Sequence, residues 1–230
     1  MPTPSIFGCA KQHVVRHIPF FLVQLPELMI VIVCRNKFSG EIKHLKHKIG
    51  FPSLDVLDIA STQFLGKLST DFFIVTQLRS LKISENKLEG NLPASLDKCK
   101  RLEVLNFGNN LIHDKFSFRL EKLPSLKVLI LRGNIFLCNI TRFDSESGFP
   151  KLRILNIASN FSGGLSIEFL QSLKAMEIVT NREKAKLNYI GEHYYLDSET
   201  ILNKGDERVY WNVLTILTSF DLSSISFEGK

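Results

Sequence analysis

Apolar residues recur along this chain at a fixed spacing, in units that each open on a leucine and carry further apolar residues three and five positions later. The frame is L-x-x-L-x-L-x-x-N-x-L-x-G-x-I/L, and its units start at Leu28, Leu54, Leu78, Leu102, Leu126 and Leu152. Successive starts lie 26, 24, 24, 24 and 26 residues apart, and a further match starts at Leu217 after a gap. The apolar–polar–apolar alternation predicts one short strand in each unit, with the apolar side chains inward.

A period of about 20 to 29 residues with this pattern is that of the leucine-rich repeat, in which each turn adds one strand and one return segment to a curved solenoid. The predicted fold is therefore an α/β repeat solenoid. We expect a curved leucine-rich repeat array with a parallel β-sheet on the concave face and irregular or 3₁₀ return segments on the convex face. In one return segment, the spacing of Leu96, Cys99 and Leu102 predicts that Cys99 is packed inside as a small apolar residue.

The asparagine of the frame stands where the chain leaves the strand and turns. Its amide both donates and accepts, so stacked copies can satisfy backbone groups that would otherwise be buried unpaired at about 1–3 kcal/mol each. Thr62 in one unit keeps part of this hydrogen bonding, whereas Ile225 in the last match keeps none. We expect a structural ladder of Asn36, Asn86, Asn110, Asn134 and Asn160.

The array is interrupted after its sixth strand-bearing repeat. Leu152 and Leu217 are 65 residues apart where 24 are expected, so about 40 residues loop out of the solenoid. Alternation over 194–202, followed by a turn at Gly205, predicts a hairpin there. We divide the chain into a non-matching segment (1–17), the repeats (18–176), an island insertion with the hairpin (177–213) and the start of a further repeat (214–230).

The island is expected to pack on the flank of the solenoid through its aromatic residues, because an insertion without a core of its own must lean on something. Contact with a partner is the alternative. These aromatic residues are Tyr194, Tyr195, Tyr210 and Trp211.

Composition excludes several classes of protein. Hydrophobic residues make up 44% of the chain, too many for a structureless tail. The net charge of +6 is too diffuse to indicate a nucleic acid partner. The densest basic run, 43–48, lacks aromatic residues between its basic ones and lacks metal-ligand spacing, so we interpret it as a solvated loop. No metal site, cofactor or disulfide scaffold is expected from the widely separated Cys9, Cys34, Cys99 and Cys138.

The longest apolar run, 18–34, is broken by Pro19, Pro26 and Glu27 and is too short to span a bilayer as a helix. It also has no small-residue cleavage site after it, so it does not fit a signal peptide. We assign it to the back half of a repeat, and expect neither a signal peptide nor a transmembrane helix in this chain.

The sequence contains no Gly-rich phosphate loop, no G-x-S-x-G and no H-E-x-x-H, so we predict a non-enzymatic protein. Binding is expected on the concave face, where stacked strands present a wide, rigid surface. Its small polar columns suit recognition of a protein, a peptide or a glycan, and equally suit a merely solvated strand face. The candidate ligand-binding residues are Asp58, Lys82, Glu85, Asn106, Arg132 and Asn156.

Two N-x-S/T sequons occur. Asn139 lies after a strand turn, where a glycan could project. Asn160 belongs to the ladder, and its amide should be occupied inside. In a secreted chain we therefore expect glycosylation of Asn139 and not of Asn160.

The run Leu88-Glu89-Gly90-Asn91-Leu92-Pro93 resembles the plant-specific extracellular class of leucine-rich repeat. The stretches 149–160 and 174–176, with 194–198, 203–205 and 216–222, resemble the island region of plant receptor-like proteins, the kinase-less surface receptors of the disease-resistance type. The resemblance implies a location on the extracellular side of the plasma membrane. It also implies a protein or peptide ligand in defence or development, and signalling through a co-receptor kinase.

Members of that family begin with a signal peptide and a cysteine-paired cap, carry more repeats and end in a membrane helix. None of these features is found here, so the resemblance implies a truncated fragment of an ectodomain. Two alternatives are a soluble leucine-rich repeat inhibitor of a secreted hydrolase and an inert truncated paralogue. The island argues against the inhibitor, because such inhibitors are short and uninterrupted.

Overall fold

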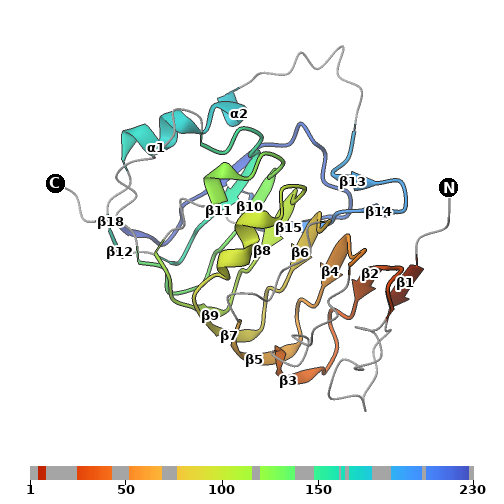
Figure 1. Ribbon diagram of the computed structural model, residues 1–230. Coiled ribbons are helices and arrows are strands. Elements are labelled where there is room, and N and C mark those ends of the chain that lie inside the picture. The colour runs from red at the N-terminus through yellow and green to blue at the C-terminus, as the bar shows by residue number, and fades with distance from the viewer. Residues whose placement is uncertain are drawn as a thin grey trace.

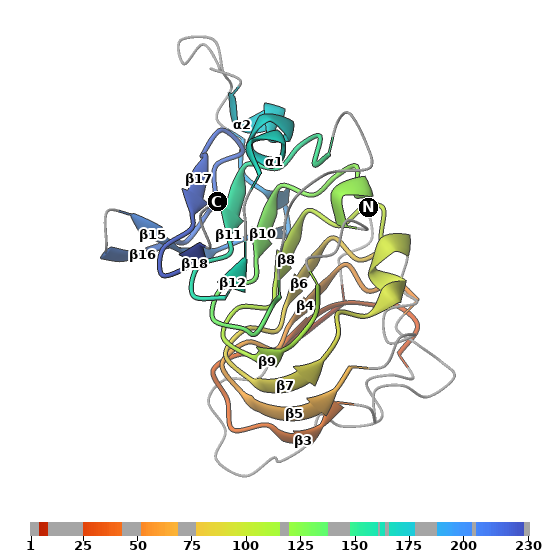
Figure 2. The ribbon, with the colours of Figure 1, turned by 90° about the vertical axis from the view of Figure 1, so that its left-hand side faces the viewer.

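The computed structural model describes residues 5–8, 25–42, 52–68, 77–115, 120–137, 148–160, 162–163, 166–177, 188–203 and 206–227. Among these residues, eight parallel strands stack side by side into one curved sheet (Figures 1 and 2). The predicted solenoid fold is thereby confirmed. In sheet order the strands are β1 (Ser5–Gly8), β2 (Leu28–Ile32), β4 (Val56–Asp58), β6 (Ser80–Lys82), β8 (Val104–Asn106), β10 (Val128–Ile130), β11 (Ile154–Asn156) and β17 (Ser219–Asp221).

A second parallel sheet, which the frame does not predict, runs beside the first. Within the described residues it contains, in order, β3 (Ser39–Glu41), β5 (Gln63–Lys67), β7 (Lys87–Gly90) and β9 (Leu111–Ile112). Gly66 and Gly90 both adopt φ +87°, and a Cβ there would come within 3.3 Å of a side-chain carbon of the preceding turn. The glycine of the frame therefore allows the backbone to bend where the turns pack closely.

Several return segments are helical where the structure describes them. The turns η3 (Ala94–Lys98) and η4 (Leu120–Lys122) are the expected 3₁₀ segments, on the opposite side of the solenoid from the island hairpin (Figure 2). After β11 the return is instead α-helical, with α1 (Ile167–Ser172) and α2 (Lys174–Glu177). The reason is a local cap, because Ser166 Oγ accepts a hydrogen bond from Phe169 N at 3.2 Å and so favours an α-helical start.

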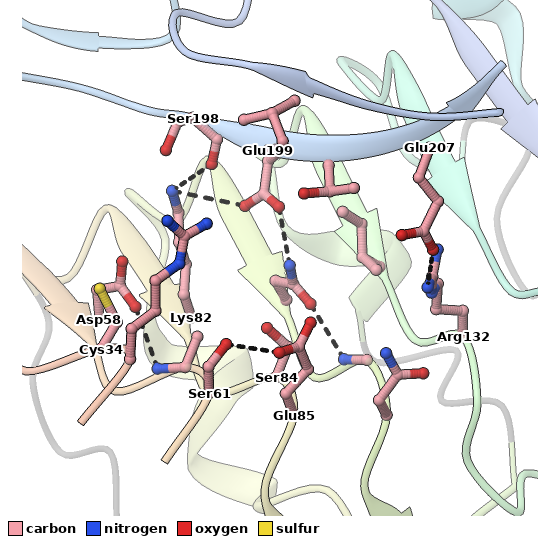
Figure 3. Close-up of a pocket in the computed structure, with 18 of the residues that line it drawn as sticks. Cys34, Asp58, Ser61, Lys82, Ser84, Glu85, Arg132, Ser198, Glu199 and Glu207 are labelled. Atoms are coloured by element: carbon pink, nitrogen blue, oxygen red, sulfur yellow. Dashed lines mark hydrogen bonds and ion pairs between the residues drawn. The ribbon is translucent and has the colours of Figure 1, made fainter. Parts of the chain in front are cut away.

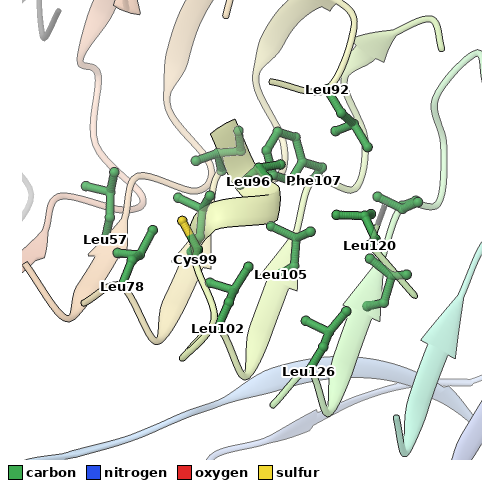
Figure 4. Packing of buried hydrophobic residues seen from close by; sticks show 14 of the residues in the cluster. Leu57, Leu78, Leu92, Leu96, Cys99, Leu102, Leu105, Phe107, Leu120 and Leu126 are labelled. Atoms are coloured by element: carbon green, nitrogen blue, oxygen red, sulfur yellow. The ribbon is translucent and has the colours of Figure 1, made fainter. Parts of the chain in front are cut away.

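The core fills the space between the first sheet and the return segments. Its leucines come from successive turns and interdigitate along the axis of the solenoid (Figure 4). Cys99 lies among them with 0% of its surface exposed, as its spacing predicts. A fully buried leucine contributes about 1.5–3 kcal/mol, and these contributions are available only when the neighbouring turns are in place.

The ladder asparagines connect one turn to the next. Asn86 Nδ2 donates to Ile59 O of the preceding turn at 3.0 Å and to Ile83 O of its own turn at 3.1 Å. Its Oδ1 accepts from Phe64 N at 3.0 Å. The equivalent bonds recur at Asn110 and Asn134.

The hydrogen bonding of the ladder is different at its first position, Asn36, and at Thr62 and Ile225, where the frame has no asparagine. Asn36 Nδ2 donates to carbonyls of its own turn, Val33 O and Cys34 O. Thr62 replaces an asparagine and its hydroxyl lies 2.9 Å from Ile59 O and 2.6 Å from Asn86 Oδ1, so part of the hydrogen bonding survives as expected. Ile225 packs against the core as an apolar side chain.

The residue before each ladder position adopts a left-handed backbone conformation. Non-glycine residues with φ between 52° and 56° occupy this position at Arg35, Ser61, Glu85, Asn109, Ser159 and Ser224. The left-handed region is unfavourable for a residue with a Cβ by roughly 1–2 kcal/mol. The hydrogen bonds of the ladder hold each turn in this strained conformation. The side chain of the left-handed residue points away from the core.

Three further pairings lie at the two ends of the array. Residues 5–8, which match nothing in the frame, form β1 and pair with β2 at one edge of the sheet. At the other end, β11 pairs directly with β17, so the solenoid resumes as soon as the island ends. Beside that pair, β12 (Ser162–Gly163) pairs with β18 (Ser226–Phe227). The sequence did not predict β1, because a strand of four residues without a ladder asparagine is too short to be detected from its pattern.

Several sequence-based expectations concern residues outside the described ranges, namely the basic run 43–48, Cys9, Cys138, Asn139 and Gly205. In the part of the chain that the structure describes, no helix is both long and apolar enough to cross a membrane.

The two sequons can be separated by experiment. Asn160 Nδ2 donates to Leu131 O at 2.6 Å and to Ile157 O at 3.2 Å, and its Oδ1 accepts from Asn134 N at 2.8 Å. Since a glycan on Nδ2 would break this rung of the ladder, we predict that glycopeptide mass spectrometry of the secreted chain finds sugar on Asn139 and none on Asn160. Sugar on Asn160 would contradict the assignment of this residue to the ladder.

Candidate functional site

The island lies across the concave face of the solenoid and not on its flank, which corrects the expected position. It contains two antiparallel pairs, β13 (Gly191–Glu192) with β14 (Tyr195–Leu196) and β15 (Glu199–Asn203) with β16 (Asp206–Tyr210). The second pair lies in the segment for which the alternation predicts a hairpin. Figure 3 shows this hairpin above the ends of the concave strands, with Ser198, Glu199 and Glu207 turned toward Lys82 and Arg132.

A buried network of charged side chains fastens the island to β6 and its neighbours. Arg79 Nη1 donates to Asp197 Oδ2 at 2.8 Å, and Ser80 Oγ donates to Asp197 Oδ1 at 2.6 Å. Arg79 also pairs with Asp55 at 3.3 Å. Asp197 has 0% of its surface exposed. A charge buried to this degree is tolerated only when it is paired and hydrogen-bonded, so this network holds the island in one position.

Lys82 sits in the same network. Its Nζ donates to Ser198 O at 2.7 Å and lies 3.3 Å from Asp197 Oδ1 and 3.6 Å from Glu199 Oε1. Asn106 Nδ2 donates to Glu199 Oε2 at 2.8 Å. Lys82 and Asn106 were expected to be open to a ligand, but both are buried beneath the island. The reason is charge complementarity, since the island presents carboxylates to the basic side chains at the centre of the concave face.

Apolar contacts complete the attachment. A band of concave residues packs against the island and forms a second hydrophobic cluster with Tyr210 at its edge. From the solenoid it contains Val104, Val128, Ile130 and Ile154, and from the island Ile190, Ile201 and Val213. Val104, Val128 and Ile154 stand at the same position of the frame, just before its second inward apolar residue. Their apolar character could have indicated that this part of the concave face is covered, because a strand face open to water does not favour successive Val and Ile residues.

The four aromatic residues of the island have different roles. Tyr194 donates its hydroxyl to Asp55 Oδ2 at 3.0 Å. The ring centroid of Tyr195 lies 6.0 Å from Arg79 Cζ and 5.8 Å from Lys82 Nζ, within range of a cation–π interaction. Trp211 differs from the rest because 71% of its surface is exposed. Packing thus accounts for three of these residues and leaves Trp211 at the surface.

A pocket of about 260 Å³ remains between the concave face and the hairpin. Five of the six candidate residues line it, namely Asp58, Lys82, Glu85, Asn106 and Arg132. Asn156 does not line it. Asn156 is buried, and its Oδ1 accepts a hydrogen bond from Ala158 N at 3.1 Å. The island contributes the opposite wall with Ser198, Glu199, Thr200, Glu207, Val209 and Trp211.

The floor of the pocket comes from the strained turns. Arg35, Ser61, Glu85 and Asn109, each in the left-handed conformation, all line it. Glu85 is exposed, and its Oε2 accepts a hydrogen bond from Ser61 Oγ at 2.6 Å. On the far side, Arg132 pairs with Glu207 of the hairpin. Polar groups from four successive turns thus meet island side chains that are far away in sequence.

Burial changes the protonation of these groups. Burial raises the pKa of Glu199 to about 7, although Lys82 partly counteracts it. Burial also raises the pKa of Asp58, again against the effect of Lys82. For Lys82 burial acts in the opposite direction, but the carboxylates of Glu199 and Asp197 outweigh it and raise the pKa, so the ammonium stays charged.

One cysteine, Cys34, lines the pocket. Burial and the neighbouring Asp58 raise the pKa of the Cys34 thiol to about 11, so at neutral pH it is not a thiolate nucleophile. No group of three or more His, Cys, Asp or Glu side chains arranged to hold a metal ion occurs among the described residues. What the pocket offers is a set of hydrogen-bonding groups and carboxylates beside an exposed indole.

Comparison with known proteins agrees with the fold. A Leucine Rich Repeat family model matches residues 77–99. The chain has the leucine-rich repeat fold. Its curated relatives include Receptor-like protein 35 of Arabidopsis thaliana, 37% identical over 93% of this chain and 22% of the relative. Receptor-like protein 53 of the same plant is 36% identical over 100% of this chain and 24% of the relative. The chain spans about a quarter of the length of these relatives.

Solved structures show the same fold. The crystal structure of a TDR receptor is 26% identical, with a TM-score of 0.59 over 68% of this chain and 26% of that chain. The Arabidopsis receptor kinase HAESA, solved with the peptide hormone IDA and the co-receptor SERK1, is 23% identical, with a TM-score of 0.54 over 74% of this chain and 32% of that chain.

The charge network predicts what holds the island in place. Replacing Asp197 by Asn leaves Arg79 and Lys82 buried with one carboxylate fewer, and removing one partner of a buried ion pair costs about 3–5 kcal/mol. We expect D197N to lower the opening free energy of the island by about this amount, measured by hydrogen exchange of the amides of β15. The matched control D206N, at an exposed hairpin position, should change it by less than about 0.5 kcal/mol. Equal effects of the two variants would show that the network does not anchor the island.

The raised pKa of Glu199 predicts a pH dependence. Because this pKa is about 7 in the folded chain against an ordinary 4.5, the folded state holds this proton more strongly than the unfolded chain. Its contribution is complete below about pH 4.5 and is lost as pH rises through 7. The free energy of unfolding in urea should therefore fall from pH 5 to pH 8 by about 2–3 kcal/mol more than in E199Q. Variant E192Q, at an exposed position, should keep the wild-type slope. An unchanged slope in E199Q would contradict the assignment.

Proposed function

We propose that this chain is part of the ligand-recognising ectodomain of a plant cell-surface receptor-like protein. The pocket between the concave face and the island hairpin would contact the ligand. The observation that carries this proposal is the convergence in one pocket of side chains from successive turns and from the island, which are far apart in sequence. The names of the sequence relatives support a receptor as the larger protein.

The ligand that best suits the site is a protein or peptide. A pocket of about 260 Å³ is smaller than the roughly 300–1,000 Å³ usual for sites that enclose a whole small molecule. It has room for one side chain or one sugar unit of a larger ligand. The rest of such a ligand would lie along the exposed edge of the hairpin and the turns beside it.

The receptor assignment includes a location and a signalling route. We propose that the chain acts on the extracellular side of the plasma membrane and that a co-receptor kinase transmits the signal. The location and the route rest on the sequence relatives, which are named receptor-like proteins. The fold shared with HAESA, which was solved with a peptide hormone and a co-receptor, is compatible with them.

Filling the pocket tests whether it is the binding surface. Ser84 lines the pocket and is half-buried, so S84Y would occupy much of its volume and leave the backbone bonds of the turn in place. A displayed library of random peptides is panned against the secreted full chain. We expect the selected peptides to bind S84Y at least about tenfold more weakly than wild type, a loss of about 1.4 kcal/mol.

The matched control is K87Y, which places the same side chain at an exposed position of β7 outside the pocket. It should bind the selected peptides as wild type does, and both variants should retain the wild-type Tm. Selected peptides that bind S84Y and wild type equally well would show that the chain uses another surface.

A further inference from the structure

With every group ionised, the carboxylates that line the pocket outnumber its cations by one, although the whole chain has a net charge of +6. Its charged lining residues are three cations, Arg35, Lys82 and Arg132, and four carboxylates, Asp58, Glu85, Glu199 and Glu207. Two of the cations are already engaged, since Lys82 is shared between Asp197 and Glu199 and Arg132 pairs with Glu207. The carboxylates are therefore under-neutralised in the structure as it stands.

Glu199 shows this most clearly. It is 5% exposed and lines the pocket, and its Oε2 accepts a hydrogen bond from Asn106. Its other oxygen, Oε1, accepts no hydrogen bond within the described part of the chain, and its ion-pair distance to Lys82 Nζ is a long 3.6 Å. A buried carboxylate oxygen without a donor is costly, so Glu199 leaves incompletely compensated negative charge beside the pocket.

The elevated pKa values of Glu199 and Asp58 have the same origin. Burial removes water from both carboxyl groups, and Lys82 alone does not fully compensate. A second positive charge in the pocket would lower both pKa values and strengthen the negative charge that attracts it. The groups that face Glu199 are Lys82 from β6, Asp58 from β4, Asn106 from β8 and Asp197 of the island.

Trp211 supplies the remaining wall. Its ring lines the pocket and is 71% exposed, and Val209 beside it on the hairpin is 46% exposed. An aromatic face attracts an organic cation through its quadrupole, and its apolar surface can cover the aliphatic stem that carries the charge. A pocket that combines carboxylates with an exposed indole is therefore suited to a long basic side chain.

On the basis of the proposed function of this pocket, we propose that its ligand is a protein or peptide that inserts an arginine or lysine side chain between Trp211 and the exposed carboxylate of Glu85, in the field of the buried Glu199. The aliphatic stem lies on the indole, and the charged group donates hydrogen bonds to the carboxylate of Glu85. Arg35 and Arg132 line the same pocket, so an anionic side chain is the opposing possibility that the experiment must separate.

The intrinsic tryptophan fluorescence of the chain reports on this site, because Trp211 is its only tryptophan. Three blocked tripeptides, acetyl-Gly-X-Gly-amide with arginine, citrulline or glutamate at X, are titrated into the full secreted chain while Trp211 fluorescence is followed. Citrulline has the shape of arginine without its charge. We expect a saturable change with arginine, binding at least about tenfold weaker with citrulline, and none with glutamate. Raising the salt concentration from about 0.05 M to about 0.5 M should weaken arginine binding severalfold.

Two single-charge variants test the contact. E85Q removes a carboxylate from the pocket, whereas E89Q removes one from the exposed face of β7 in the second sheet, outside the pocket. We expect E85Q to weaken arginine binding by about five- to tenfold with citrulline binding unchanged, and E89Q to leave both unchanged.

Other outcomes would overturn the proposal. Citrulline binding as tightly as arginine would show a polar pocket without selection for charge, and a response only to glutamate would show an anion site. Equal effects of E85Q and E89Q would show that net charge alone attracts the probe. The first two of these results leave the pocket as the binding surface. No response to any probe, together with selected peptides that bind S84Y as they bind wild type, would overturn both proposals.

Discussion

Stacking of neighbouring turns is the interaction on which everything else in this protein depends. A unit of 24 residues has one short strand and one return segment, and its leucines can be buried only against the next unit. The asparagine ladder makes the same demand on the backbone, since Asn86 satisfies groups of its own turn and of the turn before. Because each turn repeats the geometry of the last, side chains at equivalent positions are brought into columns across the sheet.

These columns also place the site. The residue before each ladder position is forced into a left-handed turn, and the successive side chains Arg35, Ser61, Glu85 and Asn109 come to lie in one row. The strain at each turn is modest and is offset by the hydrogen bonds of the ladder. A rigid row of polar side chains is the result, held by a scaffold that does not need to move when a ligand approaches.

The island converts this open row into a pocket. It is inserted between β11 and β17, which remain paired, so its presence leaves the solenoid intact. It is fastened by two kinds of contact, the apolar band around Ile201 and the buried charges around Asp197. The apolar band supplies general adhesion, whereas the charges fix one position, because a small displacement would leave Arg79 or Lys82 without a partner in a medium of low polarity.

The sequence by itself determined the strands of the solenoid, the buried position of Cys99 and the hydrogen-bonding role that Thr62 keeps, because periodic local patterns report directly on which side of a strand or turn is buried. It also singled out Asp58, Glu85 and Arg132, three residues that line the pocket. Only the tertiary structure decided that Lys82 and Asn106 are covered, that Arg79 joins Asp197, and that Trp211 stands open. Those outcomes depend on contacts across more than 90 residues of chain, and no local period encodes where an insertion without a repeat of its own comes to rest.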